Sequence, residues 1–318
     1  MISKEKSLEI VEYNLQNGDE ATLVAFNIPM ETLNRYKREY KKHYGDSADL
    51  LMALKKKFSD AELVELAKKD SCIPSWQTNS ISFDGEDIVF GAICDTHVGS
   101  QYTDESLISS AIKEFKKQNC SFMVHCGDVV EGMSGRDGHV YELSHVGYKA
   151  QKDATVAILK EWDKPSYYIS GNHDLWYMSK ADMGADIVSD ICNELPNATY
   201  LGPHEGEIDV NGVTIRLWHG ADGSSATHSY RVQQILSSLA PEDVPDVLLT
   251  AHVHKNGYFY DRGCHAMMLG CLQSQSGYMR YKRLPAHVGF YVIRMKVQNG
   301  RLVTFSPTFY PIAGELYE

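Results

Sequence analysis

The spacing of apolar residues changes near residue 87, and this change divides the chain into two parts. Before it, apolar residues recur every three or four positions, as Leu8, Val11 and Leu15 do, which is the spacing of amphipathic helices. This first helix ends at Asn17-Gly18, a common stop signal. Further helices are predicted over residues 20–26, from residue 29 to residue 42, and over residues 60–69.

From residue 87 onward, short apolar runs alternate with helical patterns. Five runs have the length and composition of strands buried on both faces: residues 88–94, 122–126, 167–170, 214–218 and 247–251. Helical spacing or strong alternation marks three more segments: helices over residues 105–118 and 150–162, and a hairpin over residues 289–310. Alternating strands and helices are typical of a layered α/β fold. We therefore expect an all-helical segment over residues 1–70, a polar linker over residues 71–86 and an α/β domain over residues 87–318.

Side chains that bind metals or act in catalysis follow each of the five predicted strands. They are Asp95-Thr96-His97, Gly127-Asp128, Gly171-Asn172-His173-Asp174, His219-Gly220 and His252-Val253-His254. Because binding residues collect on loops beyond the carboxyl ends of strands, we expect these five loops to meet at one edge of the fold. The glycines beside Asp128 and Asn172 would let the backbone turn sharply where strand becomes loop.

Aspartate, asparagine and histidine in this pattern point to a pair of divalent metal ions. Two such ions about 3.5–4 Å apart can clamp a phosphate, activate a water and stabilise the leaving oxygen. The arrangement needs one carboxylate between the ions, surrounded by imidazole, carboxylate and carbonyl ligands. Oxygen and imidazole donors together suit manganese, iron or zinc better than calcium.

The order of these motifs across residues 88–270 resembles that of the calcineurin-like metallophosphoesterases. The resemblance implies a β-sheet sandwich flanked by helices, and it implies a role for each ligand. The first metal would be held by Asp95, His97 and His254. The second would be held by Asn172, His219 and His252, and the two ions would be bridged by Asp128. One position departs from the family pattern, since Ala251 stands where the last motif usually has glycine.

The same resemblance implies catalytic roles for two neighbouring residues. His173 would act as general acid on the leaving group or stabilise the transition state. Asp174 would orient the His173 imidazole, because a carboxylate commonly fixes a histidine tautomer. The other histidines are expected to be structural or to face solvent. For His139 and His145, on a glycine-rich loop after the second motif, substrate contact is the alternative.

Local similarities bear on which phosphoester is cleaved. Phosphoprotein phosphatases of this superfamily have an arginine after the second motif; residues 127–132 lack one, although Arg136 lies nearby. Residues 95–100 look like the opening motif of DNA-processing members. Residues 245–258 and 272–276 resemble the exonuclease small subunit of archaeal D-family DNA polymerases. Like the SbcD-type nucleases, that subunit is a manganese-dependent phosphodiesterase that trims DNA, so the resemblance implies a two-metal DNA exonuclease.

Two alternatives to the exonuclease stay open. Shared ancestry without a shared substrate would make the protein a phosphatase or a cyclic-nucleotide phosphodiesterase that acts on small nucleotides. The second alternative is a non-catalytic DNA-binding subunit. Polymerase small subunits of that kind have lost metal ligands, whereas this chain retains every one.

Two groups of residues outside the motifs bear on DNA binding. Residues 21–40 resemble a helix-turn-helix with a basic second helix, although Leu23 and Asn27 depart from the usual pattern. The alternative is a helical pad that packs on the catalytic domain or on a partner, with its cations solvated. Aromatic residues after the fifth motif would stack on unpaired bases or, alternatively, pack on strand faces: Tyr258, Phe259, Tyr260, Tyr278 and Tyr281.

Charge and composition limit the partners and the compartment. A formal net charge of −11 argues against loose adhesion to DNA as the main activity, because such binding needs a basic surface. Seven scattered cysteines form no C-x-x-C pair, which is typical of a reducing compartment. No apolar stretch approaches the roughly 18 residues of a membrane span, and residues 1–15 lack a signal-peptide pattern. We therefore expect a cytoplasmic protein with DNA as substrate and no membrane partner.

Overall fold

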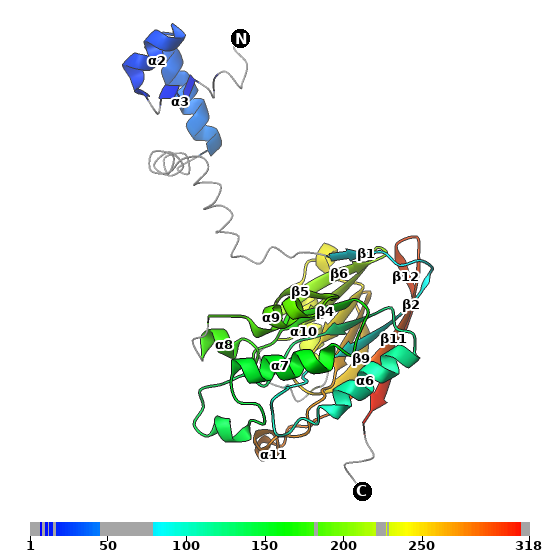
Figure 1. The fold of residues 1–318 in the computed structure, drawn as a ribbon. Helices are drawn as coiled ribbons and strands as arrows, with labels where there is room; N and C mark the ends of the chain where they lie inside the picture. Colours follow the sequence, from blue (N-terminus) through cyan, green and yellow to red (C-terminus); the bar gives the residue numbers. More distant parts are fainter. Residues whose placement is uncertain are drawn as a thin grey trace. The chain divides into compact units, whose positions relative to one another are not determined.

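The computed structural model describes residues 7, 10, 11, 13, 14, 17–44, 79–180, 184–220, 227 and 229–312 (Figure 1). The chain divides into two compact units, Met1–Ser75 and Trp76–Glu318. The helix predicted over residues 60–69 lies outside the described residues, as does the first half of the predicted linker, residues 71–78. Within the described residues, no helix combines the length and the apolar character that a membrane crossing needs.

The first unit contains the helices α2 (Asp19–Phe26) and α3 (Met30–Tyr44). Asn27 ends α2 by adopting the left-handed conformation, with φ of 48°. Leu33 of α3 packs with Ile10 in a small buried cluster. Within the described residues, the N-terminal segment is therefore helical, as the sequence predicted.

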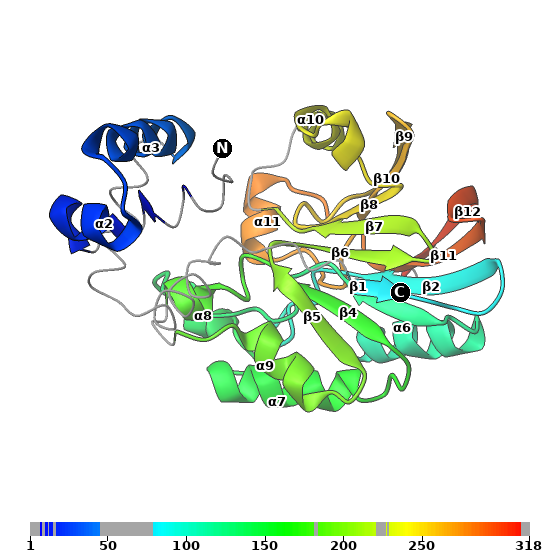
Figure 2. The ribbon, with the colours of Figure 1, turned by 90° about the horizontal axis from the view of Figure 1, so that it is seen from above.

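The second unit contains two six-stranded sheets that pack face to face (Figure 2). The first sheet has the order β12-β11-β2-β3-β4-β5 and consists of β2 (Asp87–Ile93), β3 (Phe122–His125), β4 (Ser166–Ser170), β5 (Ala198–Pro203), β11 (Gly289–Gln298) and β12 (Arg301–Pro311). The second has the order β1-β6-β7-β8-β10-β9 and consists of β1 (Asn79–Ile81), β6 (Glu205–Val210), β7 (Val213–Trp218), β8 (Val247–Thr250), β9 (Asn256–Asp261) and β10 (Cys264–Leu269). One hydrophobic core includes Phe90 and Phe122 of the first sheet and Ile215 and Leu249 of the second.

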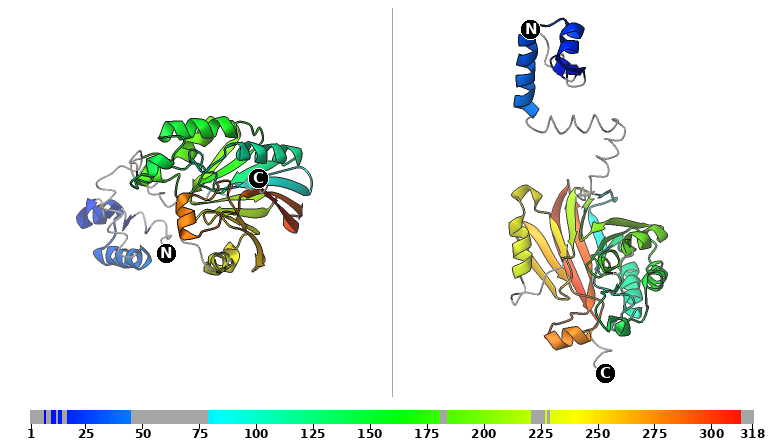
Figure 3. Two further views of the ribbon diagram at one scale, coloured as in Figure 1. Left: turned by 90° about the horizontal axis from the view of Figure 1, so that it is seen from below. Right: turned by 90° about the vertical axis from the view of Figure 1, so that its left-hand side faces the viewer.

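Helices cover the outer faces of both sheets (Figure 3). The first sheet is covered by α6 (Ser106–Lys117), α7 (Tyr148–Leu159) and α9 (Ile187–Glu194), and the second by α10 (Tyr230–Ser238). The remaining short helices are α8 (Trp176–Ser179), α11 (Gly277–Lys282) and the 3₁₀ helices η1 (His139–Glu142) and η2 (Pro241–Asp243). In α6 the apolar residues recur at helical spacing, so that Ile108 and Phe115 point to the sheet and are buried. The predicted layered α/β fold, a sandwich flanked by helices, is confirmed.

All five predicted buried strands are present, but they belong to two sheets. β2, β3 and β4 are parallel neighbours in the first sheet, and β7 and β8 are parallel neighbours in the second. An apolar run indicates that a strand is buried on both faces, but it does not indicate which sheet the strand joins. The loops after these strands meet at one end of the sandwich, so both sheets contribute to whatever is built there.

Two further segments show where short-range patterns succeed and where they fail. β1 lies within the range predicted as a linker and pairs in parallel with β6, with Asn79 opposite Ile208. A three-residue edge strand is too short to show a periodic pattern. The predicted hairpin is present as β11 and β12, and its turn residues Asn299 and Gly300 both have positive φ, as a type I′ turn requires.

Gly91 of β2 allows a test of how tightly α6 packs on the first sheet. A Cβ atom at this position would lie 2.5 Å from the Phe115 ring. We expect Gly91→Ala to lower the free energy of unfolding by about 1–3 kcal/mol, the usual cost of overpacking a core, as measured by urea denaturation. The double variant Gly91→Ala/Phe115→Leu should lose less free energy of unfolding than the two single variants lose in sum. Strictly additive losses would contradict the contact.

Candidate metal centre

The seven predicted metal ligands come together at the end of the sandwich where their five strands finish. Those from the first sheet follow β2, β3 and β4 and are Asp95, His97, Asp128 and Asn172. Those from the second sheet follow β7 and β8 and are His219, His252 and His254. The interface between the two sheets therefore ends in a group of side chains that could bind metal ions.

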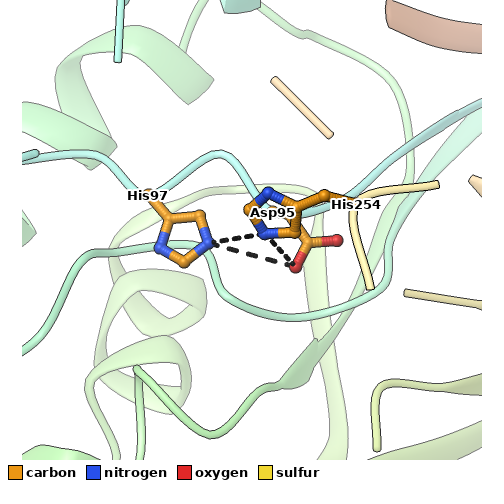
Figure 4. Close-up of side chains that lie close together, drawn as sticks. All are labelled: Asp95, His97 and His254. Carbon is orange, nitrogen blue, oxygen red and sulfur yellow. Dashed lines mark hydrogen bonds and ion pairs between the residues drawn. The ribbon is translucent and has the colours of Figure 1, made fainter. Parts of the chain in front are cut away.

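The first cluster consists of Asp95, His97 and His254 (Figure 4). Nε2 of His254 lies 3.3 Å from Oδ1 of Asp95 and 3.3 Å from Nε2 of His97, and the His97 nitrogen lies 4.0 Å from the same carboxylate oxygen. Asp95 is fully buried, and its Oδ1 accepts no hydrogen bond from the described residues. A buried carboxylate oxygen that shares one small space with two imidazole nitrogens is a donor set that a divalent cation would satisfy.

The second cluster consists of Asp128, His219 and His252, and Asn172 lies beside it. Nε2 of His219 is 3.0 Å from Oδ2 of Asp128 and 3.2 Å from Oδ1 of Asn172. Nδ1 of His219 lies 2.7 Å from the Cys126 carbonyl oxygen. Because a carbonyl only accepts, Nδ1 donates this bond, which leaves Nε2 as the nitrogen that faces the cluster.

Asp128 lies between the two clusters. Its Oδ2 is 3.0 Å from Nε2 of His219 and 3.8 Å from Nε2 of His97, which belongs to the first cluster. Burial opposes ionisation, yet the surrounding imidazoles hold the pKa of Asp128 well below its usual range, and His254 lowers the pKa of Asp95 to about 2 against the same burial. Two ionised carboxylates in a buried space fit a pair of divalent cations.

Most of these ligands sit on backbone that residues with a Cβ rarely adopt. Asp95, His97, Asp128, His252 and His254 all have φ between 45° and 74°. Left-handed backbone of this kind costs of order 1–3 kcal/mol per residue and collects at functional sites. In an extended strand, successive side chains would point to opposite faces. Residues i and i+2, such as His252 and His254, would share one face, whereas the bends let His254 lie with Asp95 and His97 while His252 lies with Asp128 and His219.

The two glycines predicted to allow sharp turns act in different ways. Gly127 has φ of 86°, so it supplies the conformational freedom that was expected. Gly171 does not have such a φ, and the reason for glycine there is space. A Cβ at Gly171 would lie 2.3 Å from Oδ1 of Asp128 and 2.7 Å from Nε2 of His219. The loop after β4 therefore approaches the metal ligands as closely as a backbone can.

His173 lies beside the first cluster, with its ring against Trp176. Its ring centroid is 3.8 Å from that of Trp176 and 4.5 Å from that of His97. Nδ1 donates to the Glu131 carbonyl oxygen at 2.9 Å, so Nε2 is the nitrogen left for substrate. Burial lowers the pKa of His173 to about 4. Both predicted roles of His173 need a proton on Nε2, and a bound phosphate anion would favour that proton by raising the pKa.

The contacts of Asp174 correct its predicted role. Its carboxylate accepts hydrogen bonds from the backbone amides of Val129 at 3.2 Å, Val130 at 2.8 Å and Gly171 at 2.8 Å. The His173 imidazole bonds to a backbone carbonyl instead. Asp174 therefore fixes the loop after Asp128 and the loop before Asn172 against each other, rather than orienting His173.

Glu131 belongs to the site although sequence reasoning did not select it. This buried carboxylate places Oε2 3.0 Å from Nδ1 of His97 and Oε1 3.1 Å from Nε2 of His139. Gln273 donates to Oε2 at 3.1 Å. A carboxylate behind a ligating histidine fixes its tautomer and turns the other nitrogen toward the metal. The signal in the sequence is a carboxylate in the otherwise apolar run of residues 129–132 that follows Asp128.

The two clusters open into a cavity of about 450 Å³. Ligands from both clusters and His173 line one part of it. Other parts are lined by Trp176, Tyr102 and Tyr278, and by Arg136 and His139 from the glycine-rich loop. Of the two histidines on that loop, His139 thus combines a structural bond to Glu131 with a place in the cavity wall. His145 bonds to Glu105 at 2.9 Å and is not among the lining residues.

Replacing Glu131 tests whether its carboxylate orients His97. We expect Glu131→Gln to weaken Mn²⁺ binding about tenfold or more, the usual effect of removing a partner behind a metal ligand. Isothermal titration of the metal-stripped protein measures the affinity. Glu105→Gln is the matched control, because it changes the same side chain in a half-exposed pair with His145. Equal affinity in the two variants would show that Glu131 does not orient the ligand.

Comparison with known proteins identifies the family. Residues 88–283 match the model of the calcineurin-like phosphoesterase superfamily domain. The DNA polymerase II small subunit of Halobacterium salinarum, in two strains, is 24% identical to the chain over 227 residues, which covers 58% of the chain and 44% of the relative. The chain thus spans less than half the length of the curated relatives it matches.

Two solved structures are among those to which the chain is similar. An archaeal phosphodiesterase shares 14% identity with a TM-score of 0.40, over 70% of this chain and 100% of its own. A dimetal phosphatase from Danio rerio shares 12% identity with a TM-score of 0.38, over 70% of this chain and 99% of its own. The family match alone extends over more than half of the sequence and includes every predicted metal ligand. The chain therefore belongs to the calcineurin-like phosphoesterase superfamily and is a metal-dependent phosphoesterase.

Proposed function

We propose that this phosphoesterase cleaves phosphodiesters in DNA and acts as an exonuclease. The observation that carries the proposal is the position of Asp128 between two ligand clusters, in one cavity with His173. Of the described residues that line the cavity, Arg136 is the one arginine or lysine, and its guanidinium pairs with Glu142 at 2.6 Å. A phosphodiester carries less charge than a terminal phosphate and has less need of a free cationic side chain, which favours the diester.

The donor set supports two divalent ions, and we propose manganese, with iron or zinc as alternatives. The first ion would be held by Asp95, His97 and His254. The second would be held by Asn172, His219 and His252, with Asp128 shared by both. Once bound, two such ions polarise the phosphoryl oxygens, activate a water and neutralise the charge that develops on the leaving oxygen.

The protein's own side chains would position the phosphate and transfer a proton. His173 presents Nε2 to the cavity and would donate its proton to the departing oxygen. The Glu131 carbonyl holds the opposite ring nitrogen, so the imidazole cannot turn away. Apolar lining from Trp176 and Met279 would limit the access of bulk water to the reacting centre.

The choice of DNA is supported by the curated relatives, which are named as small subunits of a DNA polymerase. We propose residues 87–318 as the catalytic domain, residues 71–86 as its linker and residues 1–70 as a separate helical domain. Within that domain, Lys37 of α3 pairs with Asp19 of α2, so part of the basic helix serves the fold. Arg38 is exposed in α3 and would remain for a DNA contact.

An assay on labelled DNA tests the exonuclease directly. Metal-stripped protein is incubated with an end-labelled oligonucleotide and added Mn²⁺, and the products are separated on a denaturing gel. We expect a ladder of shortened products that is missing with His173→Ala. An intact oligonucleotide, together with hydrolysis of mononucleotides or cyclic nucleotides by the same protein, would replace the proposal with a small-nucleotide phosphatase or phosphodiesterase.

The alanine variants of His173 and Asp128 should differ in whether they lose metal binding as well as turnover. We expect His173→Ala to bind Mn²⁺ like the unchanged protein and to lose about 10²–10⁴-fold in turnover, the usual contribution of a general acid. Asp128→Ala should lose bound metal as well as turnover, because it removes the carboxylate that lies between the clusters. Metal content is measured by mass spectrometry of the dialysed proteins. Full activity in His173→Ala would remove this residue from the mechanism.

A further inference from the structure

The short helix α11 carries positive charge that the described structure leaves without ion pairs. Arg280, Lys282 and Arg283 are all exposed, and none of them pairs with a carboxylate in the parts of the chain that are described. Lys282 lies instead over the Tyr281 ring, 5.6 Å from its centroid. In a chain whose net charge is −11, three neighbouring unpaired cations form a local basic patch.

Two exposed tyrosines stand among these cations. Tyr278 is 55% exposed and Tyr281 is 81% exposed, whereas Met279 between them is buried and anchors the helix. The helix ends are fixed as well, because Ser276 accepts a bond from the Met279 amide at 3.2 Å and the Leu284 amide donates to the Met279 carbonyl at 2.9 Å. The two rings are therefore held outward on a well-anchored backbone.

α11 also forms part of the rim of the metal-site cavity. Tyr278 and Met279 line that cavity together with His97 and His254. The Ser274 amide donates to the Tyr102 carbonyl at 2.9 Å, which ties the segment before α11 to the loop after His97. Because Tyr278 both lines the cavity and faces solvent, a ligand that extends out of the cavity on this side would pass over α11.

The other tyrosines that the sequence pointed to are placed differently. Tyr258 and Tyr260 belong to β9, an edge strand of the second sheet. Their rings pack on His265, and the Tyr258 hydroxyl lies 2.8 Å from Nδ1 of that histidine. Neither is among the residues that line the cavity. Exposed aromatic faces, unpaired cations and contact with the metal site thus coincide at α11.

We propose that α11 binds a single DNA strand and guides its end to the metal centre. The cations contact backbone phosphates, and Tyr278 and Tyr281 stack on bases. Stacking on a ring face needs an unpaired base, so the preferred substrate is a single-stranded or frayed end. This inference rests on the proposed phosphodiesterase and adds to it the form of the DNA and the surface that holds it.

Strand binding is measured without cleavage, by fluorescence anisotropy of a labelled oligothymidylate in the presence of a chelator. We expect Arg280→Gln/Lys282→Gln to bind the oligonucleotide at least about tenfold more weakly. The slope of log K against the logarithm of the salt concentration should become shallower by about 1 for each cation removed. The matched control is Lys113→Gln/Lys160→Gln, which removes the same charge from exposed positions at α6 and α7. It should bind like the unchanged protein.

A second variant separates stacking from charge. We expect Tyr278→Ala/Tyr281→Ala to weaken binding about tenfold while leaving the salt dependence unchanged, because stacking involves no counterions. Equal binding by the α11 variants and the lysine control would overturn the inference. So would tighter binding of the duplex of the same sequence than of the single strand.

Hydrolysis of bis(p-nitrophenyl) phosphate with Mn²⁺ distinguishes this inference from the proposed function. Unchanged turnover of this small diester in the Arg280→Gln/Lys282→Gln variant, with weakened DNA binding, supports strand binding by α11. Turnover lost in parallel would overturn it, because α11 would then shape the cavity itself. The protein without substitutions could also bind the strand through α11 and hydrolyse the small diester, yet leave DNA intact. That result would refute the exonuclease proposal but support the binding surface at α11.

Discussion

Much of this structure depends on keeping two buried carboxylates, Asp95 and Asp128, ionised. Neither lies in water, so each needs positive charge or polarised hydrogen nearby, and the imidazoles that surround them come from both sheets of the sandwich. Many of the candidate ligands adopt left-handed backbone, and these bends distribute residues two positions apart, such as His252 and His254, between the two clusters. The bends also explain why Asp174 is used to hold three backbone amides, because loops under such strain stay in place only when their surroundings fix them.

The fold and the clustering of the candidate ligands were accessible from sequence because both are expressed locally. A strand buried on two faces must be apolar along its whole length, and a metal-binding loop must begin with a particular residue type just after it. Residues 88–97, where an apolar run leads directly into Asp95 and His97, show both signals within ten positions. The hairpin of β11 and β12 was equally accessible, because alternation and Asn299-Gly300 each require only neighbouring residues.

The rest of the fold and of the site depends on which residues meet across the fold, and no local sequence pattern indicates that. Glu131 is adjacent to an apolar run in the sequence, but its partners are His97, His139 and Gln273, from three separate segments. Asp174 follows His173 directly, yet a buried carboxylate bonds to the donors that surround it, which here are backbone amides. The assignment of strands to two sheets and the short pairing of β1 are also decided by contacts far apart in the chain.

Each proposed metal cluster takes ligands from both sheets, so a bound ion would tie one half of the sandwich to the other. Ion binding would then contribute to conformational stability. When the free concentration of the ion is about 100 times its dissociation constant, binding adds about 2.7 kcal/mol to the free energy of unfolding. That is a substantial share of the roughly 5–15 kcal/mol by which domains are stable. Without metal, the two sheets would be held together less firmly and the chain would be more open to proteases. Metal supply would therefore govern the abundance of the protein as well as its catalytic turnover.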